Sequence, residues 1–496
     1  MELLKRIEET ARRDGSRSAY RSRDGEISYR DLWENSGRLA GYLQEKLPSD
    51  GSPLIVYGHK SFMMPVCFLA CVRSGHPYCP VDTGMTKTRI RDIAGIVGQL
   101  FILAPETEDT GIFGSGYEVL GQKECFQAAQ EGPKILNCPE RNGEESFYII
   151  FTSGSTGKPK GVVITCDNLE HYLQWSSGLA GGIAEGSVFL DQAPFSFDLS
   201  VMDLYTGLYT GSTVIAVDKT LQQDSLAMMA FLTANHVEYW VSTPSFAEVC
   251  LAEPQFDEIR LKTIKAFLFC GETLPVKTAA MLKNRFPAAK VINTYGPTES
   301  TVCVTAVEIT NEMIRRGGAL PVGMPKPGTK ILIQPDNQEV LILGDTVSPG
   351  YFRDLEKTEA AFFTGYEGVC GYRTGDTGHF DEEGLLYCDG RLDRQIKLHG
   401  YRIELDDVET NLLKIDGVSQ AAVVPFVRKG KVGGMNAFVV VDQCQIPQGF
   451  HGRKRIREEL GKLLPSYMIP KRVIILDELP LTANDKIDRK RLERTR

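Results

Sequence analysis

Residues 147–161 bring together residue types that can bind a polyphosphate. Five apolar residues, Phe147–Phe151, are typical of a buried strand. Six small residues follow, and two lysines then flank a proline. Small residues let backbone N–H groups approach an anion closely, while hydroxyls and lysines add donors and positive charge. The candidates for phosphate contacts are Thr152, Ser153, Gly154, Ser155, Thr156, Gly157, Lys158 and Lys160.

The spacing of this segment differs from that of the common P-loop. A P-loop has four residues between its first glycine and a Gly-Lys-Ser/Thr triplet that opens a helix. Here Gly154 and Gly157 are only two residues apart, and Pro159 follows Lys158. The composition by itself is equally typical of a flexible surface hairpin, so both interpretations stay open at this point.

Polar side chains also follow a strand that the sequence predicts at residues 290–293. The Tyr295 ring can lie against an adenine, and the Thr298 hydroxyl can donate to a phosphate. Glu299 offers a hard oxygen ligand of the kind that Mg²⁺ prefers. The alternative interpretation is a simple Gly-Pro turn.

Asp198 has the chemistry to bind a substrate amino group. It lies directly before a predicted helix whose first residues are apolar, among them Leu199 and Met202. A carboxylate at the mouth of an apolar pocket can pair with an ammonium group. Aspartate is also a good helix N-cap, and the residues alone do not decide between the two roles.

A turn at Cys270, Gly271 and Glu272 follows another predicted strand. Gly271 would permit the close approach of a flat ligand. Cys270 is either a wall of a ligand pocket or a buried core thiol. A nucleophilic role is not indicated, because no histidine or cation lies near it in the sequence.

The elements that must position these residues alternate between strands and helices from about residue 160 to 293, which favours a parallel α/β architecture. In such sheets ligands bind at the carboxyl ends of strands, where the strings above fall. Residues 104–146 show only a weak helix or strand pattern, which predicts a surface excursion. Asp167 is expected to cap a helix. From about Ile331 short extended segments predict a β-rich region, and the pattern changes again near residues 389–394.

Composition sets outer limits on the function. A chain of 496 residues is too long for one core, so two or more domains are expected. The longest apolar run, residues 62–72, is too short to span a bilayer. The start of the chain is charged rather than signal-like, so the 12 cysteines are expected to be reduced thiols.

The charge is unevenly distributed. The net charge of −8 argues against non-specific nucleic-acid binding. Residues 391–496 nevertheless hold 21 of the 56 basic and only 14 of the 64 acidic residues. Basic clusters at 453–457 and 489–491 are either solvated helix faces or a docking surface for an acidic partner, and the sequence leaves both open.

Taken together, these sequence motifs resemble the signatures of the adenylate-forming enzymes, the superfamily of acyl-CoA ligases, luciferases and peptide-synthetase adenylation domains. The resemblance covers nearly the whole chain from about Ser28, and it is closest to members that activate amino acids. Residues 372–376 (Tyr-Arg-Thr-Gly-Asp), 390–393 (Gly-Arg-Leu-Asp) and 482–489, which include Lys486, complete the set. The chain departs from the pattern at Asp485, where the family usually has glycine.

The resemblance implies a role for each matching residue. Asp198 would hold the α-amino group, Asp376 the ribose hydroxyls and Glu299 a Mg²⁺ ion. Lys486, Thr298 and Arg391 would be catalytic, and the small domain would rotate about Asp393. The implied ATP contacts are residues 152–158 and Lys160 above, with Gly271, Glu272, Thr273, Asn293, Thr294, Tyr295, Gly296, Thr298, Asp376, Arg391 and Lys486. The implied amino-acid contacts are Asp198, Leu199, Met202, Cys270, Val302 and Lys486.

The implied fold is α/β. A large N-terminal domain, residues 1–390, would combine parallel-rich sheets and helices with a small β-rich subdomain. Residues 391–394 would form a hinge, and residues 395–496 a small mobile α+β domain that acts as a lid.

The resemblance also implies the reaction: ATP-dependent activation of D-alanine as an aminoacyl-adenylate and its transfer to the phosphopantetheine thiol of a carrier protein, for D-alanylation of teichoic acids. The strings at 193–205 and 269–275 resemble those of D-alanine-activating members. The expected protein is a cytoplasmic monomer that uses ATP and Mg²⁺, binds no nucleic acid and inserts into no membrane.

Two alternatives remain. One is a stand-alone adenylation enzyme for another small amino acid in nonribosomal peptide synthesis. The other is a non-catalytic nucleotide-binding scaffold, against which the joint presence of Glu299, Asp376 and Lys486 argues.

Overall fold

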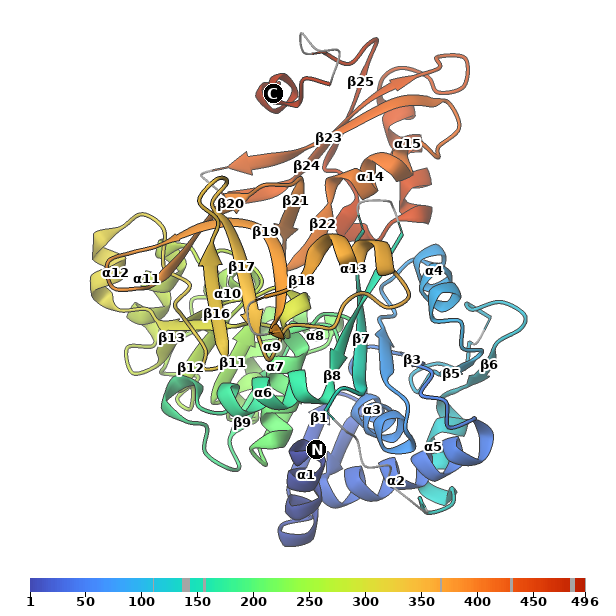
Figure 1. The fold of residues 1–496 in the computed structure, drawn as a ribbon, viewed down its shortest axis with the longest axis vertical. Coiled ribbons are helices and arrows are strands. Elements are labelled where there is room, and N and C mark those ends of the chain that lie inside the picture. Colours follow the sequence, from blue (N-terminus) through green and yellow to red (C-terminus); the bar gives the residue numbers. More distant parts are fainter. Residues whose placement is uncertain are drawn as a thin grey trace. The chain divides into compact units, whose positions relative to one another are not determined.

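The chain forms two compact units (Figure 1). A computed structural model describes residues 1–109, 111–135, 143–154, 158–365, 368–428, 431–481 and 487–495. The first unit consists of residues 1–83, 97–150 and 161–392, and the second of residues 84–96, 151–160 and 393–496. The first unit therefore ends at Leu392. The second includes residues 151–160, which hold the predicted phosphate contacts.

A nine-stranded sheet organises the first unit. Its strand order is β15-β14-β13-β12-β11-β9-β10-β1-β2. The pairs from β13 to β1 are parallel, and antiparallel strands close both edges. The strands are β1 (Ser18–Ser22), β2 (Gly25–Ser28), β9 (Val188–Asp191), β10 (Thr213–Ala216), β11 (Tyr239–Ser242), β12 (Ala266–Phe269), β13 (Lys290–Tyr295), β14 (Thr305–Glu308) and β15 (Met324–Pro325).

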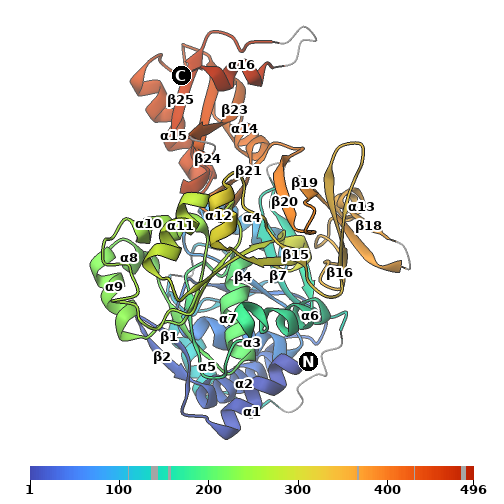
Figure 2. The ribbon, with the colours of Figure 1, turned by 90° about the vertical axis from the view of Figure 1, so that its left-hand side faces the viewer.

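Helices connect the parallel strands, as the alternating pattern predicts. Side-chain caps begin several of them; for example, Asp224 accepts from the Ala227 N–H, and Thr243 accepts from the Phe246 N–H. Figure 2 shows several of these helices gathered together beside the sheet. The helices between parallel strands are α7 (Leu199–Tyr209), α8 (Lys219–Gln222), α9 (Ser225–Ala234), α10 (Pro244–Leu251) and α11 (Val276–Arg285). The helix α12 (Asn311–Arg316) lies between the antiparallel strands β14 and β15.

A six-stranded sheet, in the order β6-β5-β3-β4-β7-β8, forms the other large layer. A continuous apolar core joins its strands to the helices around it, and Phe68 stacks on Tyr78 at a ring distance of 4.2 Å. The strands are β3 (Leu54–Tyr57), β4 (Tyr78–Val81), β5 (Phe101–Leu103), β6 (Glu118–Leu120), β7 (Ser146–Thr152) and β8 (Lys160–Thr165). The helices are α1 (Glu2–Arg13), α2 (Tyr29–Lys46), α3 (Met63–Ser74), α5 (Gln122–Glu131) and α6 (Cys166–Ser176).

Two sequence predictions in this region are wrong. Residues 104–146 are not simply a surface excursion, because they contain β6 and α5, and the Glu124 carboxylate accepts from the Gly121 N–H at the start of that helix. The cap of α6 is Thr165 rather than Asp167. The Thr165 hydroxyl accepts from the Asn168 N–H, and the Asn168 side chain accepts from the Thr165 N–H.

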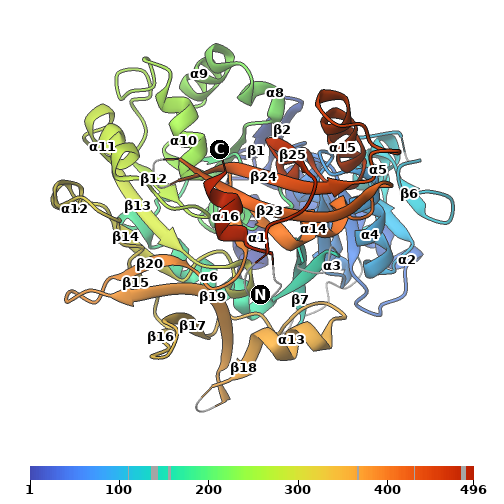
Figure 3. The same cartoon turned by 90° about the horizontal axis from the view of Figure 1, so that it is seen from above.

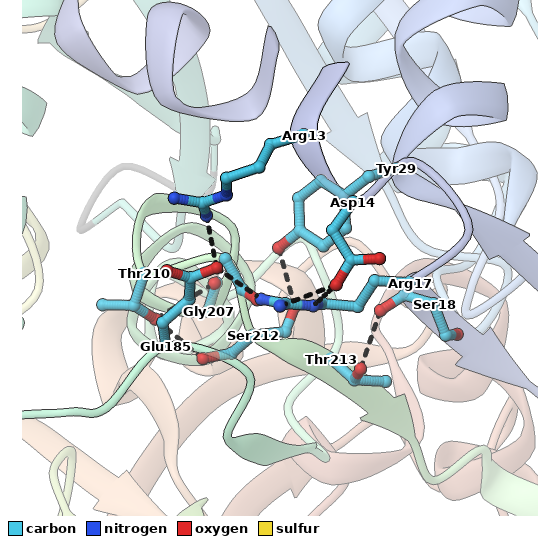
Figure 4. A network of polar contacts seen from close by, with 11 residues as sticks. Arg13, Asp14, Arg17, Ser18, Tyr29, Glu185, Gly207, Thr210, Ser212 and Thr213 are labelled. Carbon is cyan, nitrogen blue, oxygen red and sulfur yellow. Dashed lines mark hydrogen bonds and ion pairs between the residues drawn. The ribbon is translucent and has the colours of Figure 1, made fainter. Parts of the chain in front are cut away.

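A polar network fastens the N-terminal helix to the nine-stranded sheet (Figure 4). Arg17 donates to Glu185 and to the Gly211 carbonyl, each at 2.8 Å. The Tyr29 hydroxyl donates to the Ser212 carbonyl at 2.7 Å. The Arg17 bonds tie the turn between α1 and β1 to the loops before β9 and β10, and the Tyr29 bond ties the start of α2 to the loop before β10.

A β-rich subdomain follows from residue 329, as predicted. Its strands are all antiparallel, and β19 pairs with three of the others. The elements are β16 (Thr329–Ile333), β17 (Glu339–Gly344), α13 (Leu355–Ala361), β18 (Phe362–Thr364), β19 (Cys370–Phe380) and β20 (Leu386–Arg391).

The C-terminal part of the second unit is a small α+β domain. Figure 3 shows β24 lying between β23 and β25, and helices pack around this sheet. Its elements are β21 (Gln395–Leu398), β22 (Tyr401–Glu404), α14 (Leu405–Leu412), β23 (Val418–Arg428), β24 (Lys431–Val441), α15 (Phe450–Leu463), β25 (Arg472–Leu476) and α16 (Arg489–Arg494). The same unit includes α4 (Lys87–Val97) except for its last residue.

The two basic clusters of this unit have different surroundings. Arg489 is bound to the Glu409 carboxylate at 3.0 Å, so it contributes to internal structure. By contrast, α15 and β25 line a pocket of about 700 Å³ with several cations around exposed and buried apolar side chains. Those cations are Arg453, Lys454, Arg457, Lys471 and Arg472.

No helix in the described ranges combines the length and apolar character needed to cross a bilayer. No disulfide joins the cysteines that the structure describes.

Candidate functional site

The carboxyl ends of four neighbouring parallel strands bring most of the predicted site residues to one edge of the nine-stranded sheet. Asp198 follows β9, Cys270 follows β12, and Thr298 follows β13, while β11 lies between β9 and β12. Because parallel strands end at the same edge, the predicted amino-acid and nucleotide contacts share that edge.

Asp376 joins two other predicted nucleotide contacts. Its Oδ2 accepts from the Tyr295 hydroxyl at 2.7 Å, and its Oδ1 accepts from Arg391 Nη1 at 2.6 Å. The backbone pairing of β19 with β20 sets Asp376 opposite Arg391. A carboxylate oxygen has two lone-pair directions, so each oxygen can still accept from a ligand hydroxyl.

Tyr295 is itself a buried proton donor. Burial, and then the negative charge of Asp376, raise the pKa of Tyr295 well above its ordinary value. The phenol therefore stays protonated and keeps its bond to Asp376. The neighbouring Asn293 and Thr294 are also buried, and they donate to the carbonyls of Pro321 and Phe269 at 2.7 and 2.8 Å.

Glu299 lies in a tightly folded turn. Its side chain is wholly buried, and its Oε1 accepts from the Tyr351 hydroxyl at 2.8 Å. The Ser348 N–H donates to the Glu299 carbonyl at 2.9 Å. The loop after β17 thus holds both the backbone and the carboxylate of Glu299, and sequence reasoning missed it. The Pro349-Gly350 turn beside Tyr351 was the only available signal.

The backbone after Glu299 is strained. Thr301 and Val302 both have left-handed φ values, 59° and 68°, which β-branched residues rarely adopt. At Gly296 an added Cβ would come within 2.4 Å of the Cys303 Cα, so only glycine fits where the turn folds back. This conformation sets the positions of Thr298, Glu299 and Val302 together.

Asp198 does not cap α7. Its backbone is already helical (φ −64°, ψ −21°), and its side chain accepts no capping hydrogen bond. The N-cap alternative is therefore wrong. The Asp198 carboxylate is half-buried. The pKa of Tyr148 is raised by burial first, then by Tyr78 and then by the Asp198 carboxylate, so Asp198 lies near the Tyr148 phenol.

The four apolar residues predicted to contact the amino acid belong to one buried cluster: Leu199, Met202, Cys270 and Val302. The Cys270 thiol donates to the Val302 carbonyl at 3.6 Å. Burial, and then Cys270, raise the pKa of the adjacent Cys303 thiol well above its ordinary value. A buried, protonated thiol such as that of Cys303 acts as a small apolar group rather than as a nucleophile.

The turn from Gly271 to Thr273 contacts the first turn of helix α10. Gly271 has a left-handed φ of 89°, a conformation that favours glycine. The Glu272 carboxylate accepts from the Ser245 N–H at 3.1 Å, in the first turn of α10. The negative charge of a carboxylate at this position also interacts favourably with the dipole of α10.

The small-residue segment lies in the second unit. The Ser153 hydroxyl donates to the Arg402 carbonyl at 2.8 Å, and Arg89 donates to the Thr152 carbonyl at 3.0 Å. An added Cβ at Gly154 would come within 2.3 Å of the Lys158 carbonyl oxygen, so a larger residue does not fit at Gly154. Lys158 is exposed, and Lys160 is half-buried.

Several predicted residues fall outside the described ranges. Ser155, Thr156, Gly157, Asp485 and Lys486 are outside them. Asp393 is the first residue of the C-terminal stretch of the second unit, and its carboxylate accepts from the Gln395 N–H at 3.1 Å. Within the described part of the chain, no group of three or more His, Cys, Asp or Glu side chains could hold a metal ion.

Comparison with known proteins gives a consistent result. Residues 7–352 match the family model for the AMP-binding enzyme, and residues 407–486 match that for the AMP-binding enzyme C-terminal domain. The D-alanine–D-alanyl carrier protein ligase of Bacillus licheniformis is 42% identical over 511 aligned residues, and that of Bacillus anthracis 41% over 503. Each alignment covers 99% of both chains.

Solved structures are also similar. An NRPS protein containing adenylation and PCP domains superposes with a TM-score of 0.85 at 26% identity, covering 99% of this chain and 83% of that one. A Vibrio cholerae adenylation domain in complex with glycyl-adenosine-5'-phosphate shares the fold, with a TM-score of 0.79, 22% identity and coverage of 99% and 96%. The chain therefore belongs to the AMP-binding enzyme family.

Proposed function

We propose that this protein is an ATP-dependent ligase that activates D-alanine as an aminoacyl-adenylate and transfers it to the phosphopantetheine thiol of a carrier protein. The observation that carries the proposal is the Asp198 carboxylate: it makes no capping hydrogen bond to its helix, and it directly precedes Leu199, a member of the buried apolar cluster that includes Cys270 and Val302. Relatives that match over the full length are named as ligases of this kind.

The first half-reaction follows from these groups. The ammonium group of D-alanine pairs with Asp198, and the methyl group meets Cys270 and Val302. A carboxylate oxygen of D-alanine attacks the α-phosphorus of ATP, the bond to the β-phosphate breaks, and pyrophosphate leaves. Asp376 accepts from the ribose hydroxyls, and Arg391 and Thr298 contribute donors near the phosphates. Lys486 offsets the negative charge that collects during the attack.

The residues around Glu299 could supply part of a Mg²⁺ site. Glu299 supplies one hard carboxylate, Tyr351 orients it, and the remaining ligands of Mg²⁺ are commonly phosphate oxygens and water. Bound there, Mg²⁺ would neutralise the charge of the phosphates. The small residues from Thr152 to Lys160 would hold the two phosphates that leave.

In the second half-reaction the thiol sulfur attacks the acyl carbon. The bond to AMP breaks, the thiol proton is released, and an aminoacyl thioester forms. No covalent enzyme intermediate is needed, because the mixed anhydride is already reactive. We further propose that the C-terminal domain rotates about Asp393 between the two steps, that the protein is a cytoplasmic monomer, and that its product serves the D-alanylation of teichoic acids.

ATP–pyrophosphate exchange with a panel of D- and L-amino acids tests the proposal. Exchange should be strongest with D-alanine. A clear preference for glycine, L-alanine or another acid would refute the choice of substrate and favour the peptide-synthesis alternative. Absence of exchange with every amino acid would favour the non-catalytic scaffold.

A further inference from the structure

We propose that Lys60 is a positioning residue for amino-acid binding: its buried ammonium group fixes the segment between β9 and α7, and so presets the Asp198 carboxylate. This inference rests on the proposed function, because the substrate contact of Asp198 is part of it. None of the strings that resemble the family includes Lys60.

Lys60 contacts three alternate residues: Asp191 at the end of β9, and Ala193 and Phe195 in the segment that follows. It lies three residues beyond the end of β3, and its side chain is almost wholly buried. Its Nζ donates to the Ala193 carbonyl at 2.5 Å and to Asp191 Oδ1. The same Nζ lies 4.2 Å from the centre of the Phe195 ring. One ammonium group therefore contacts a strand end, a loop carbonyl and an aromatic face.

These contacts join the two sheets of the first unit. Lys60 follows a strand of the six-stranded sheet, whereas Asp191 ends a strand of the nine-stranded sheet. The segment from residue 192 to 198 has no regular strand or helix of its own. Asp198 lies three residues after Phe195, so the orientation of its carboxylate depends on how this segment is held.

The charges around Lys60 make its ammonium hard to replace. Asp191 is wholly buried, and its Oδ2 also accepts from the Tyr20 hydroxyl at 2.8 Å. Asp203, on α7, is wholly buried as well. Burial, and then the charge of Asp191, raise the pKa of Asp203 well above its ordinary value, although Lys60 opposes this shift. Lys60 therefore lies beside two wholly buried carboxyl groups.

A buried ion pair is weak support for a role in stability, because apolar side chains of similar volume often stabilise a core equally well. An ammonium group does what an apolar side chain cannot: it bonds a carbonyl and a carboxylate at fixed directions while it packs against a ring. The geometry therefore points to orientation of the segment rather than to stability alone.

The test uses the full chain with Lys60→Met, which keeps the volume and removes the charge. In ATP–pyrophosphate exchange, the KM for D-alanine should rise about 10- to 100-fold, as loss of charge-assisted hydrogen bonds implies. The KM for ATP should stay within about threefold, since no nucleotide contact changes. Lys219→Met is the control, because Lys219 also pairs with a buried carboxylate, that of Asp82, at 2.5 Å; neither KM should change.

A double-mutant cycle separates positioning from general damage. Lys60→Met should have little further effect on the KM for D-alanine once Asp198→Asn has removed the group that Lys60 orients. Additive effects of the two substitutions, an equal rise of both KM values, or an unchanged KM for D-alanine in Lys60→Met would each overturn the inference.

If Lys60→Met does not fold, the pair Lys60→Met with Asp191→Asn removes both charges together, and it should show the same selective loss of D-alanine affinity. A wild-type protein that prefers another amino acid would refute the proposed substrate, and the same comparison with that amino acid would still test Lys60.

Discussion

Tyr351→Phe is the sharpest perturbation of the candidate site, because it removes a single oxygen. The Tyr351 hydroxyl donates to Glu299 Oε1 at 2.8 Å, and Glu299 is wholly buried. The Tyr351 ring packs edge-on against Phe362 at 5.3 Å, and phenylalanine keeps that contact. The substitution therefore tests the orientation of the carboxylate and leaves the packing in place.

The size of the effect follows from the charge and burial of the acceptor. A hydrogen bond to a charged group contributes about 1.5–3 kcal/mol, and no water can replace it at a site without exposure. If this free energy is lost in the transition state, kcat/KM falls about 10- to 150-fold. The Mg²⁺ concentration that gives half-maximal exchange should also rise, because Glu299 is the proposed Mg²⁺ ligand.

Steady-state ATP–pyrophosphate exchange across a Mg²⁺ titration measures both quantities. Tyr239→Phe is the matched control, since the Tyr239 hydroxyl makes a long contact of 3.5 Å with the Gly182 carbonyl and is not a predicted site residue. A Tyr351→Phe enzyme with kcat/KM within twofold of the wild type and an unchanged Mg²⁺ requirement would show that this bond does not orient Glu299 for the reaction.

Three further predictions concern other parts of the molecule. Lys486→Ala should slow adenylation about 10²- to 10³-fold and leave transfer from preformed adenylate largely intact in single-turnover assays; equal loss of both steps would contradict a moving domain. Arg453→Glu with Arg457→Glu should raise the KM for an acidic carrier protein several-fold without changing pyrophosphate exchange, whereas Lys490→Glu should change neither. Burial alone would raise the pKa of Asp82, but His59 and Lys219 outweigh it and lower the pKa to about 2. The lowered pKa adds about 2 kcal/mol to the free energy of unfolding above pH 4, and this contribution is lost as the pH falls toward 2. In urea unfolding, Asp82→Asn should therefore lack this part of the pH dependence of the free energy of unfolding.

Local signals in the sequence predict local structure well. Ser28 caps α2 by accepting from the Asp31 N–H at 3.1 Å, and the alternating pattern predicts the parallel strands that carry the site. The wrong cap at Asp167 shows the limit of such signals. Thr165 and Asp167 are both good caps two residues apart, and the Asn168 side chain, which reaches back to Thr165, decides between them.

Contacts that are distant in the sequence could not be predicted this way. Tyr295 and Asp376 were each expected near the nucleotide, but the bond between them joins residues 81 positions apart. Lys60 and Asp191 are 131 positions apart, and each looks like an ordinary surface residue in its own segment. Only the packing of the two sheets reveals the buried cluster that they form.

The left-handed residues Thr301 and Val302 have a consequence for how ATP is bound. Each left-handed residue of this kind raises the free energy of the folded chain by on the order of 1–3 kcal/mol. This strain arises when the chain folds and not when the ligand binds. Ordering one residue's backbone costs about 1–2 kcal/mol of conformational entropy, so a turn that is already ordered spares the ligand that loss. Calorimetry should therefore give a less unfavourable entropy of ATP binding for the wild type than for Val302→Gly, in which the same turn is freed to fluctuate.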